Sequence, residues 1–186
     1  MTVPVCNLMK NRKPNRLKNY DYSQAECYFV TICTKNKIDY FGEIKDEKMI
    51  LNEIGRIVEN QWLWLEKQYN YVLLDEFVVM PNHFHGIIAI IEPVGNGRDR
   101  SLQKNKSLPS IIGAFKTTSS KLIHQNLNKN FAWQKSFYDR IIRNEKEFYN
   151  IQQYIRYNPN KWQWDIENPF SGFKVKSNYY NKLFIN

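Results

Sequence analysis

Two apolar runs separated by one Pro-Asn pair constrain the fold of this chain most strongly. Residues 71–80 and 83–91 are rich in β-branched and aromatic side chains, and the turn-forming pair between them favours a β-hairpin. The second run opens with His83 and His85, and side chains two residues apart in a strand project to the same face of a sheet. Two imidazoles can therefore share one metal ion, and the alternative for such a pair is simple packing at a sheet edge.

The neighbouring patterns place this hairpin in an α+β domain. Apolar periodicity and capping residues predict five further elements: a strand over 27–34, helices over 52–68 and 108–126, a strand over 133–142, and a helix from about Asn144 to Pro159. In chain order the elements are strand, helix, strand, strand, helix, strand and helix. This order predicts a ferredoxin-like βαββαβ fold with an antiparallel sheet, helices on one face, and an added C-terminal helix.

Charge and composition indicate the kind of partner. The chain carries a formal net charge of +9 and has a pI near 9.4. Counterion release favours Lys and Arg beside phosphates, so nucleic acid is the expected partner, ahead of an anionic membrane surface. No run approaches the roughly 20 apolar residues of a membrane span, and the N-terminus lacks the apolar core of a secretion signal. The three cysteines lack CxxC spacing, which fits a reducing compartment. Together these features predict a cytoplasmic protein without a membrane partner.

The length predicts one domain with two flanking segments. Residues 1–22 form a basic arm, residues 23–160 form the domain, and residues 161–186 form a tail packed on it. The arm either follows a phosphate backbone or remains a solvated tail. The polar residues 92–107 are expected to form a loop, whose role the sequence leaves open.

The last predicted helix contains a tyrosine and an amide that share one face. Tyr154 and Asn158 lie four residues apart, which places them together on the last turn. Tyr149 and Tyr157 point elsewhere or share that face only in part, so Tyr154 is the preferred candidate for chemistry, with Asn158 as an oxygen ligand. Pro159 disfavours helical geometry at Asn158, which weakens the prediction of where that amide reaches.

Three segments carry a specific resemblance to a known family: MPNHFHGI, WQKSFYDRIIRNEKEF and YIRYNPNKW. Together they resemble the REP-associated tyrosine transposases, relatives of the IS200/IS605 single-strand transposases. Further segments resemble that family in the same order: KNYDYSQAECYFVTICTKNK, FGEI, LNEIGRIVENQW and SLPSIIGAFKTTSSKLI. The resemblance therefore covers most of the chain.

The resemblance implies an HUH endonuclease, in which two histidines around a hydrophobic residue bind a divalent ion that polarises a phosphodiester of single-stranded DNA. By motif, His83 and His85 are the metal ligands, Asn158 is the third ligand, and Tyr154 is the nucleophile that forms a 5′-phosphotyrosine and frees a 3′-hydroxyl. A tyrosine hydroxyl, with a pKa near ~10, is a poor nucleophile without such activation. Mg²⁺ or Mn²⁺ is expected, and two imidazoles favour Mn²⁺ in affinity.

The resemblance also implies a DNA partner, namely single-stranded DNA beside a folded hairpin of the REP type. A monomer and a homodimer both stay open. Candidate phosphate contacts are spread along the chain: Arg12, Lys13 and Arg16 in the arm, Lys116 and Lys121 on the second helix, and Arg140 and Arg143 before the last helix. Trp133 and Phe137 are candidates for stacking on bases, although core packing is the more common role of such residues.

Rival functions follow from the same residues. The first is a noncatalytic nucleic-acid-binding module, in which the sheet and the basic surface bind nucleic acid without cleaving it. The second is a different phosphoesterase, which is disfavoured because position 87 is Ile87 rather than a third alternating histidine, and because His124 stands alone.

Overall fold

The computed structural model describes residues 20–92 and 105–171, which contain a four-stranded antiparallel sheet. The strand order is β4-β5-β1-β6, so β5 and β1 are the central strands. These strands are β1 (Glu26–Cys33), β4 (Val72–Val79), β5 (His83–Ile90) and β6 (Tyr138–Ile141). The predicted ferredoxin-like fold class is confirmed, because every strand runs opposite to its neighbours.

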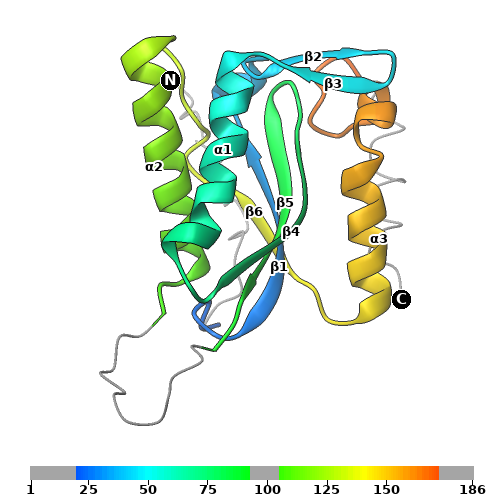
Figure 1. Cartoon of the computed structure of the whole chain (residues 1–186). Helices are drawn as coiled ribbons and strands as arrows, with labels where there is room; N and C mark the ends of the chain where they lie inside the picture. Colours follow the sequence, from blue (N-terminus) through cyan, green and yellow to red (C-terminus); the bar gives the residue numbers. More distant parts are fainter. Residues whose placement is uncertain (1–19, 93–104, 172–186) are drawn as a thin grey trace, which may run out of the picture.

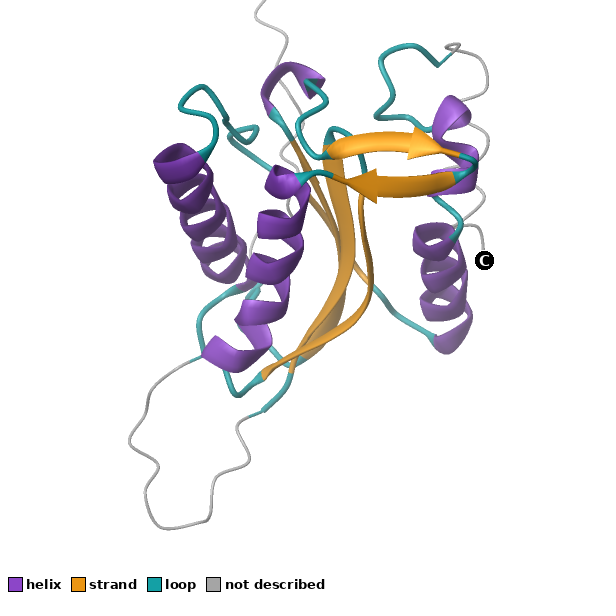
Figure 2. Cartoon of the chain, turned by 45° about the horizontal axis from the view of Figure 1, so that its top comes forward, coloured by secondary structure: helices purple, strands orange, loops and turns teal. Residues whose placement is uncertain are grey.

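Helices cover both faces of this sheet (Figure 1). The helices α1 (Glu53–Gln68) and α2 (Leu108–Asn126) lie side by side on one face, and α3 (Glu145–Arg156) lies on the other. Figure 2 shows the curved sheet between these two layers. The added C-terminal helix thus packs on the face that α1 and α2 leave uncovered. In the part of the chain that the structure describes, no helix has the length and apolarity needed to cross a bilayer.

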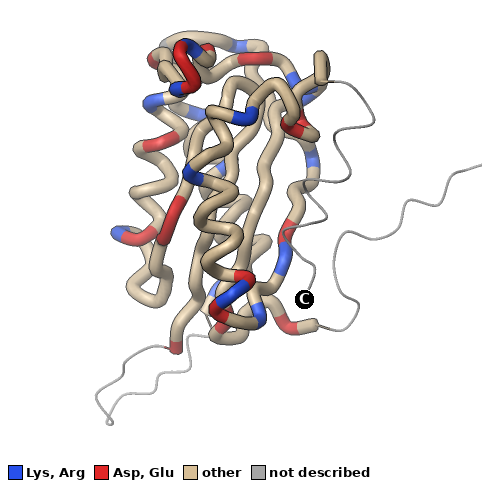
Figure 3. The backbone as a smooth tube through the Cα atoms, turned by 90° about the vertical axis from the view of Figure 1, so that its right-hand side faces the viewer, with Lys and Arg blue, Asp and Glu red and all other residues tan. Residues whose placement is uncertain are grey.

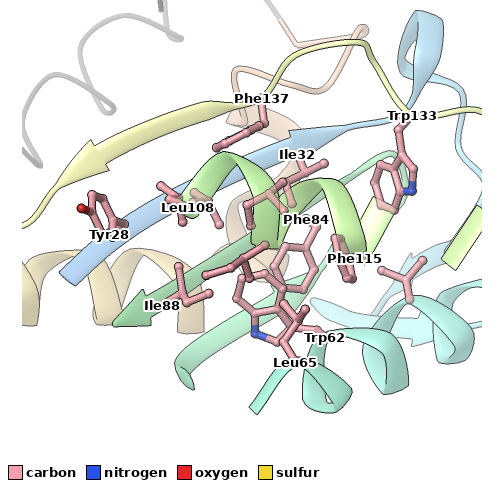
Figure 4. Packing of buried hydrophobic residues seen from close by; sticks show 14 of the residues in the cluster. Tyr28, Ile32, Trp62, Leu65, Phe84, Ile88, Leu108, Phe115, Trp133 and Phe137 are labelled. Carbon is pink, nitrogen blue, oxygen red and sulfur yellow. The ribbon is translucent and has the colours of Figure 1, made fainter. Parts of the chain in front are cut away.

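Aromatic rings fill the space between the sheet and the two helices α1 and α2. The rings of Trp62 and Phe84 have centroids 4.5 Å apart, and Phe115 meets Trp62 edge-on at 5.4 Å (Figure 4). Trp133 and Phe137 are also buried in this core, so packing is their structural role. A second, smaller cluster lies under α3 and includes Phe29, Ile87, Ile142, Ile151, Tyr154 and Ile155.

A short hairpin that the sequence analysis did not predict crosses one end of the sheet. It consists of β2 (Gly42–Lys45) and β3 (Lys48–Leu51), joined by Asp46 and Glu47, both with positive φ. Two-residue hairpin turns with positive φ at both positions usually carry Asn-Gly or Asp-Gly. This turn carries a Glu instead of Gly, so the usual sequence signal for a hairpin is absent.

The last strand is shorter than predicted. The sequence favours a strand over 133–142, whereas β6 covers only Tyr138–Ile141, and Trp133 forms an isolated bridge with Thr34. The side chain of Trp133 turns into the core and its indole N–H donates to Ser119 Oγ at 3.1 Å. Bends at residues 135 and 136 separate this bridge from β6, so the predicted strand is interrupted between them. Two short 3₁₀ segments, Lys35–Lys37 and Pro159–Trp164, complete the described elements.

The start of α3 agrees with the predicted cap. Asn144 Oδ1 accepts a hydrogen bond from the backbone N–H of Glu147 at 2.8 Å. The Glu147 carboxylate in turn accepts bonds from the backbone N–H of Arg143, at 3.0 Å, and from the Arg140 guanidinium. Asn144 and Glu147 therefore satisfy free N–H groups at this helix end in the manner of a capping box.

Gly55 and Gly113 offer a matched test of packing, because both lie in helices. A Cβ at Gly55 would stand 2.2 Å from the carbonyl oxygen of Phe41, whereas one at Gly113 would meet nothing within 4 Å. We expect Gly55→Ala to lower the free energy of unfolding by about 1–3 kcal/mol through overpacking. Gly113→Ala should raise it by about 0.5–1 kcal/mol, because alanine loses less backbone entropy. Urea unfolding measures both, and equal stabilities would contradict the close approach of Phe41.

Glu147 should make stability depend on pH. Burial raises its pKa, but the bonds from the Arg143 N–H and from Arg140 outweigh burial, so the pKa lies below its ordinary value of 4.5. A lowered pKa in the folded state adds stability above pH 4.5 that is lost as the pH falls through the folded-state pKa. We expect Glu147→Gln to cost about 1–2 kcal/mol at pH 7, judged from hydrogen bonds to charged groups.

The measurement is urea unfolding at several pH values between 7 and 3, beside the exposed first-turn variant Glu145→Gln. The difference between wild type and Glu147→Gln should shrink as the carboxylate is protonated, and the Glu145→Gln variant should show the smaller loss. A constant difference across this pH range would show that the side-chain charge is not what stabilises the start of α3.

Candidate metal and tyrosine site

The two histidines lie side by side on the sheet face that packs against α3. Both are fully buried, and their ring centroids are 4.5 Å apart. Phe84 between them points into the opposite core, as strand alternation requires. The predicted juxtaposition of His83 and His85 is therefore present, and it lies in the interior rather than at a sheet edge.

The hydrogen bonds around His83 determine its tautomer. The amide nitrogen of Asn82 donates to the carbonyl oxygens of Lys37, at 3.2 Å, and Glu167, at 3.4 Å, which turns its Oδ1 toward His83. That oxygen lies 2.9 Å from His83 Nδ1, so Nδ1–H donates to it. Nε2 of His83 then presents a lone pair, and among the described residues it has no hydrogen-bond partner.

His85 is held from three sides. Its Nδ1 lies 2.8 Å from the hydroxyl oxygen of Thr31, the residue opposite it in the β1–β5 register. Its Nε2 lies 3.1 Å from the hydroxyl oxygen of Tyr154, and its ring stacks on Phe29 with centroids 5.4 Å apart. These contacts orient the imidazole and aim Nε2 at the tyrosine.

Both imidazoles are neutral at physiological pH. Burial lowers the pKa of His83 to about 4. Burial, with the neighbouring His83, lowers the pKa of His85 to about 3. Neutral imidazole is the form that ligates metal ions, so burial preorganises both side chains for that role.

The end of α3 brings Tyr154 and Asn158 to the same place. Both are buried, whereas Tyr149 and Tyr157 are 60% and 48% exposed. Asn158 keeps helical dihedral angles despite Pro159, because the chain continues directly into the 3₁₀ turn. Its Nδ2 donates to Asp165 Oδ2 at 2.9 Å, and its Oδ1 has no partner among the described residues.

Asp165, which the sequence analysis did not single out, completes the cluster. Its Oδ2 lies 3.4 Å from the Tyr154 hydroxyl, and its Oδ1 accepts from the backbone N–H of Glu167 at 2.6 Å. Ligand atoms of His83, His85 and Asp165 all lie within 4.8 Å of one another, so this group could hold a metal ion. No motif or periodicity marks an aspartate seven residues beyond Asn158, and only the folding back of the chain reveals it.

Residues 165–171 are fastened to the sheet end beside the histidines. Glu167 pairs with Lys37 at 2.9 Å and accepts from Cys33 Sγ at 3.3 Å. Burial raises the pKa of Glu167, but the bond from the charged Lys37 outweighs burial and keeps the pKa below its ordinary value. The anionic Glu167 therefore anchors the segment that carries Asp165.

The donor atoms suit a divalent ion of intermediate hardness. The site offers two imidazole nitrogens, one carboxylate and one amide oxygen, from His83, His85, Asp165 and Asn158. Carboxylate and amide oxygens suit Mg²⁺ and Mn²⁺, and imidazole shifts the preference toward Mn²⁺. Two of the four atoms, His83 Nε2 and Asn158 Oδ1, are buried without partners, as expected of ligand atoms.

The predicted DNA contacts are not brought together at this site. Arg140 pairs with Glu147, Arg143 is exposed at the start of α3, and Lys116 and Lys121 lie on α2, across the sheet. The residues of the basic arm, Arg12, Lys13 and Arg16, lie outside the described residues, as do most of the 92–107 loop and the tail beyond residue 171.

Comparisons with known proteins place this fold. No protein-family model matches the chain. Its sequence is 38% identical over 175 residues to an uncharacterised protein of Haemophilus influenzae, a match that covers 89% of this chain and 97% of that protein. Its structure resembles that of a REP-associated tyrosine transposase bound to a REP hairpin, with a TM-score of 0.54 and 21% identity, over 81% of this chain and 75% of the other. The chain therefore belongs to the family of the Haemophilus influenzae protein, and its fold is that of a REP-associated tyrosine transposase.

Proposed function

We propose that this protein is a tyrosine transposase of the REP-associated type, a metal-dependent single-stranded DNA endonuclease and strand transferase that acts in the cytoplasm. The observation that carries the proposal is the position of the Tyr154 hydroxyl, 3.1 Å from His85 Nε2 and 3.4 Å from Asp165 Oδ2. A tyrosine beside a cluster of neutral imidazoles and a carboxylate has the parts of a metal-assisted nucleophilic site.

Tyr154 is the nucleophile in this proposal. Its phenolic oxygen bonds to the phosphorus, the bond from phosphorus to the 3′ oxygen breaks, and the phenolic proton ends on the new 3′-hydroxyl. The 5′ end stays on the protein as a phosphotyrosine, so the reverse reaction can join it to a second 3′-hydroxyl. The T-shaped contact of Tyr154 with Phe29, with centroids 6.0 Å apart, helps to hold the ring in place for attack.

His83, His85 and Asn158 would hold Mg²⁺ or Mn²⁺, with Asp165 as a further donor. The bound ion supplies Lewis-acid polarisation of the phosphate and neutralises charge on its oxygens. Asn82 and Thr31 keep the imidazoles in the required orientation through the bonds of 2.9 and 2.8 Å to their Nδ1 atoms.

Access of DNA requires movement of the covering segment. Tyr154, Asn158 and Asp165 are all buried, and Trp162 lies over His83 with ring centroids 5.9 Å apart. A phosphodiester therefore reaches the tyrosine when the 3₁₀ turn that carries Trp162 shifts, while Asp165 stays beside the histidines. Asn160 ties this segment to Glu47 in the β2–β3 turn at 2.9 Å, so the hairpin is part of the same cover.

The proposed substrate is single-stranded DNA beside a hairpin of the REP type. The proposal draws on the similar structure, which is that of a transposase bound to a REP hairpin. In this proposal the basic arm of residues 1–22 and the arginines before α3 contact DNA phosphates, around a domain that ends near residue 160 and carries a packed tail.

Metal binding is testable through stability. Mn²⁺ at 100 times its dissociation constant should stabilise the folded chain by about 2.7 kcal/mol and raise Tm, because the ion binds only the folded site. We expect His83→Ala to abolish the shift in Tm and Asp165→Asn to reduce it. His124→Ala is the matched control, because His124 is the one remaining histidine of the three. An equal Mn²⁺ shift in His83→Ala, relative to its own metal-free Tm, would place the ion elsewhere.

The covalent intermediate is testable directly. The chain is incubated with Mn²⁺ and labelled single-stranded hairpin oligonucleotides from both flanks of its own gene, and covalent adducts are resolved on denaturing gels. We expect an adduct with wild type and none with Tyr154→Phe, because the phenolic oxygen is the attacking atom. Tyr149→Phe and Tyr157→Phe, at exposed tyrosines in α3 and at its C-terminal cap, should retain it. Binding of DNA by wild type without any adduct would instead favour a noncatalytic binding module.

A further inference from the structure

A long stretch of the chain contains no acidic residue. From Leu108 to Tyr138 there is no Asp or Glu, while Lys116, Lys121, Lys129 and Lys135 all lie within it. Elsewhere the charges are mixed: Figure 3 shows basic and acidic positions interspersed over the side of the molecule that carries α3. The positive charge of this stretch is therefore not offset along its own sequence.

This stretch folds into a shallow, open groove between α2 and the segment that leads to β6. The groove has a volume of about 740 Å³, and its lining has no carboxylate. Three lysines line it, Lys116, Lys121 and Lys135, together with hydroxyl, amide, imidazole and aromatic groups. Cations beside hydroxyl and amide donors are the groups that bind a phosphodiester backbone.

The two walls of the groove are fastened to each other. Lys116 Nζ donates to the carbonyl oxygens of Gln134 and Lys135. His124 Nε2 lies 2.7 Å from the carbonyl oxygen of Phe131, so Nε2–H donates to it. These bonds link α2 to residues 131–135 at two points, and they leave the exposed Lys121 and Lys135 at the rim.

The groove adjoins the end of the sheet that carries the tyrosine site. Cys33, at the end of β1, pairs with His83 on one side, and its carbonyl accepts from Gln134 N–H at 2.8 Å on the other. His83 and Gln134 are therefore about two strand spacings apart, or about 10 Å. The tyrosine site and the groove therefore lie on opposite faces of the sheet at the same end, and a DNA strand that contacts both passes around that end.

We propose that this groove, called here the α2 groove, binds the phosphate backbone of the single-stranded DNA that flanks the cleaved bond. The inference rests on the proposed function for the identity of the strand, and on the acid-free lysine lining for the site itself. Lys121 and Lys135 contact phosphates, and the bonds made by Lys116 and His124 hold the groove in shape.

The test is a binding cycle on the full chain in EDTA, so that affinity is measured without cleavage. Two fluorescent DNA probes are used: a hairpin with single-stranded flanks and the same hairpin without them. The variant is Lys121→Glu with Lys135→Glu. The control is Arg56→Glu with Lys67→Glu, which changes the net charge equally at two exposed residues of α1 that do not line the groove.

We expect the groove variant to bind the flanked hairpin about tenfold or more weakly, and the slope of log K against log salt to fall by about 1.4, for two contacts to a single strand. It should bind the bare hairpin as tightly as wild type does, because Lys121 and Lys135 contribute to affinity only when the single-stranded flank is present. The control variant should bind each probe nearly as tightly as wild type does, with the same small loss of affinity for both.

Other outcomes overturn the inference. The inference is wrong if the groove variant binds the flanked hairpin as tightly as wild type does. It is also wrong if the groove variant loses affinity equally for both probes, or if the control variant shows the same losses, because the α2 groove then does not contact the flank specifically. Adduct formation, measured separately on wild type, reports on the tyrosine chemistry alone. If the groove variant loses affinity only for the flanked hairpin and wild type forms no adduct, the proposed function is wrong and the groove inference stands. If wild type forms an adduct and the groove variant binds both probes normally, the groove inference is wrong and the proposed function stands.

Discussion

The antiparallel pairing of β1 with β5 is the constraint on which the rest of the structure depends. Its register sets Thr31 opposite His85 and Cys33 opposite His83, so one ladder positions both imidazoles. A slip of one residue would turn the histidines toward the aromatic core and send Phe84 to the other face. Because Phe84 packs against Trp62 in that core, the packing that stabilises the domain also holds the histidines in place.

Buried polar groups cost free energy unless they are paired, and this site contains several of them, among them Asn82, His83, His85, Asn158 and Asp165. Asn82, Thr31 and Asp165 satisfy most of the hydrogen-bonding atoms, through bonds of 2.8 to 3.4 Å. Two acceptor atoms remain without partners among the described residues, on His83 and Asn158. Each such atom costs about 1–3 kcal/mol, and proteins retain costs of this kind mainly where function requires them.

The two faces of the sheet carry different parts of the molecule. The face under α3 holds Tyr154 and the two histidines in a buried site, which residues 159–171 cover. The other face holds the aromatic core, and behind it α2 presents the lysine-lined groove. Both meet at the end of β1, where Cys33 links His83 to Gln134. The proposed catalytic site and the proposed strand-binding groove thus lie on opposite faces of the sheet but are adjacent at its end.

Local pattern determined a large part of this structure. The strands β4 and β5, the helices α1 and α2, and the start of α3 at Asn144 follow from periodicity, turn residues and capping, which act over a few residues. The same spacing put His83 beside His85 and Tyr154 beside Asn158. The sequence also suggested the family fold through its motifs.

Only the tertiary structure decided the remaining features. The β2–β3 hairpin lacks the usual turn residues, and bends at residues 135 and 136 separate Trp133, whose ring is buried in the core, from the last strand. Asp165 joins the histidines through contacts between residues about 80 positions apart, and the α2 groove arises where two segments of one basic stretch face each other. Such contacts depend on packing between distant segments, which no local spacing encodes.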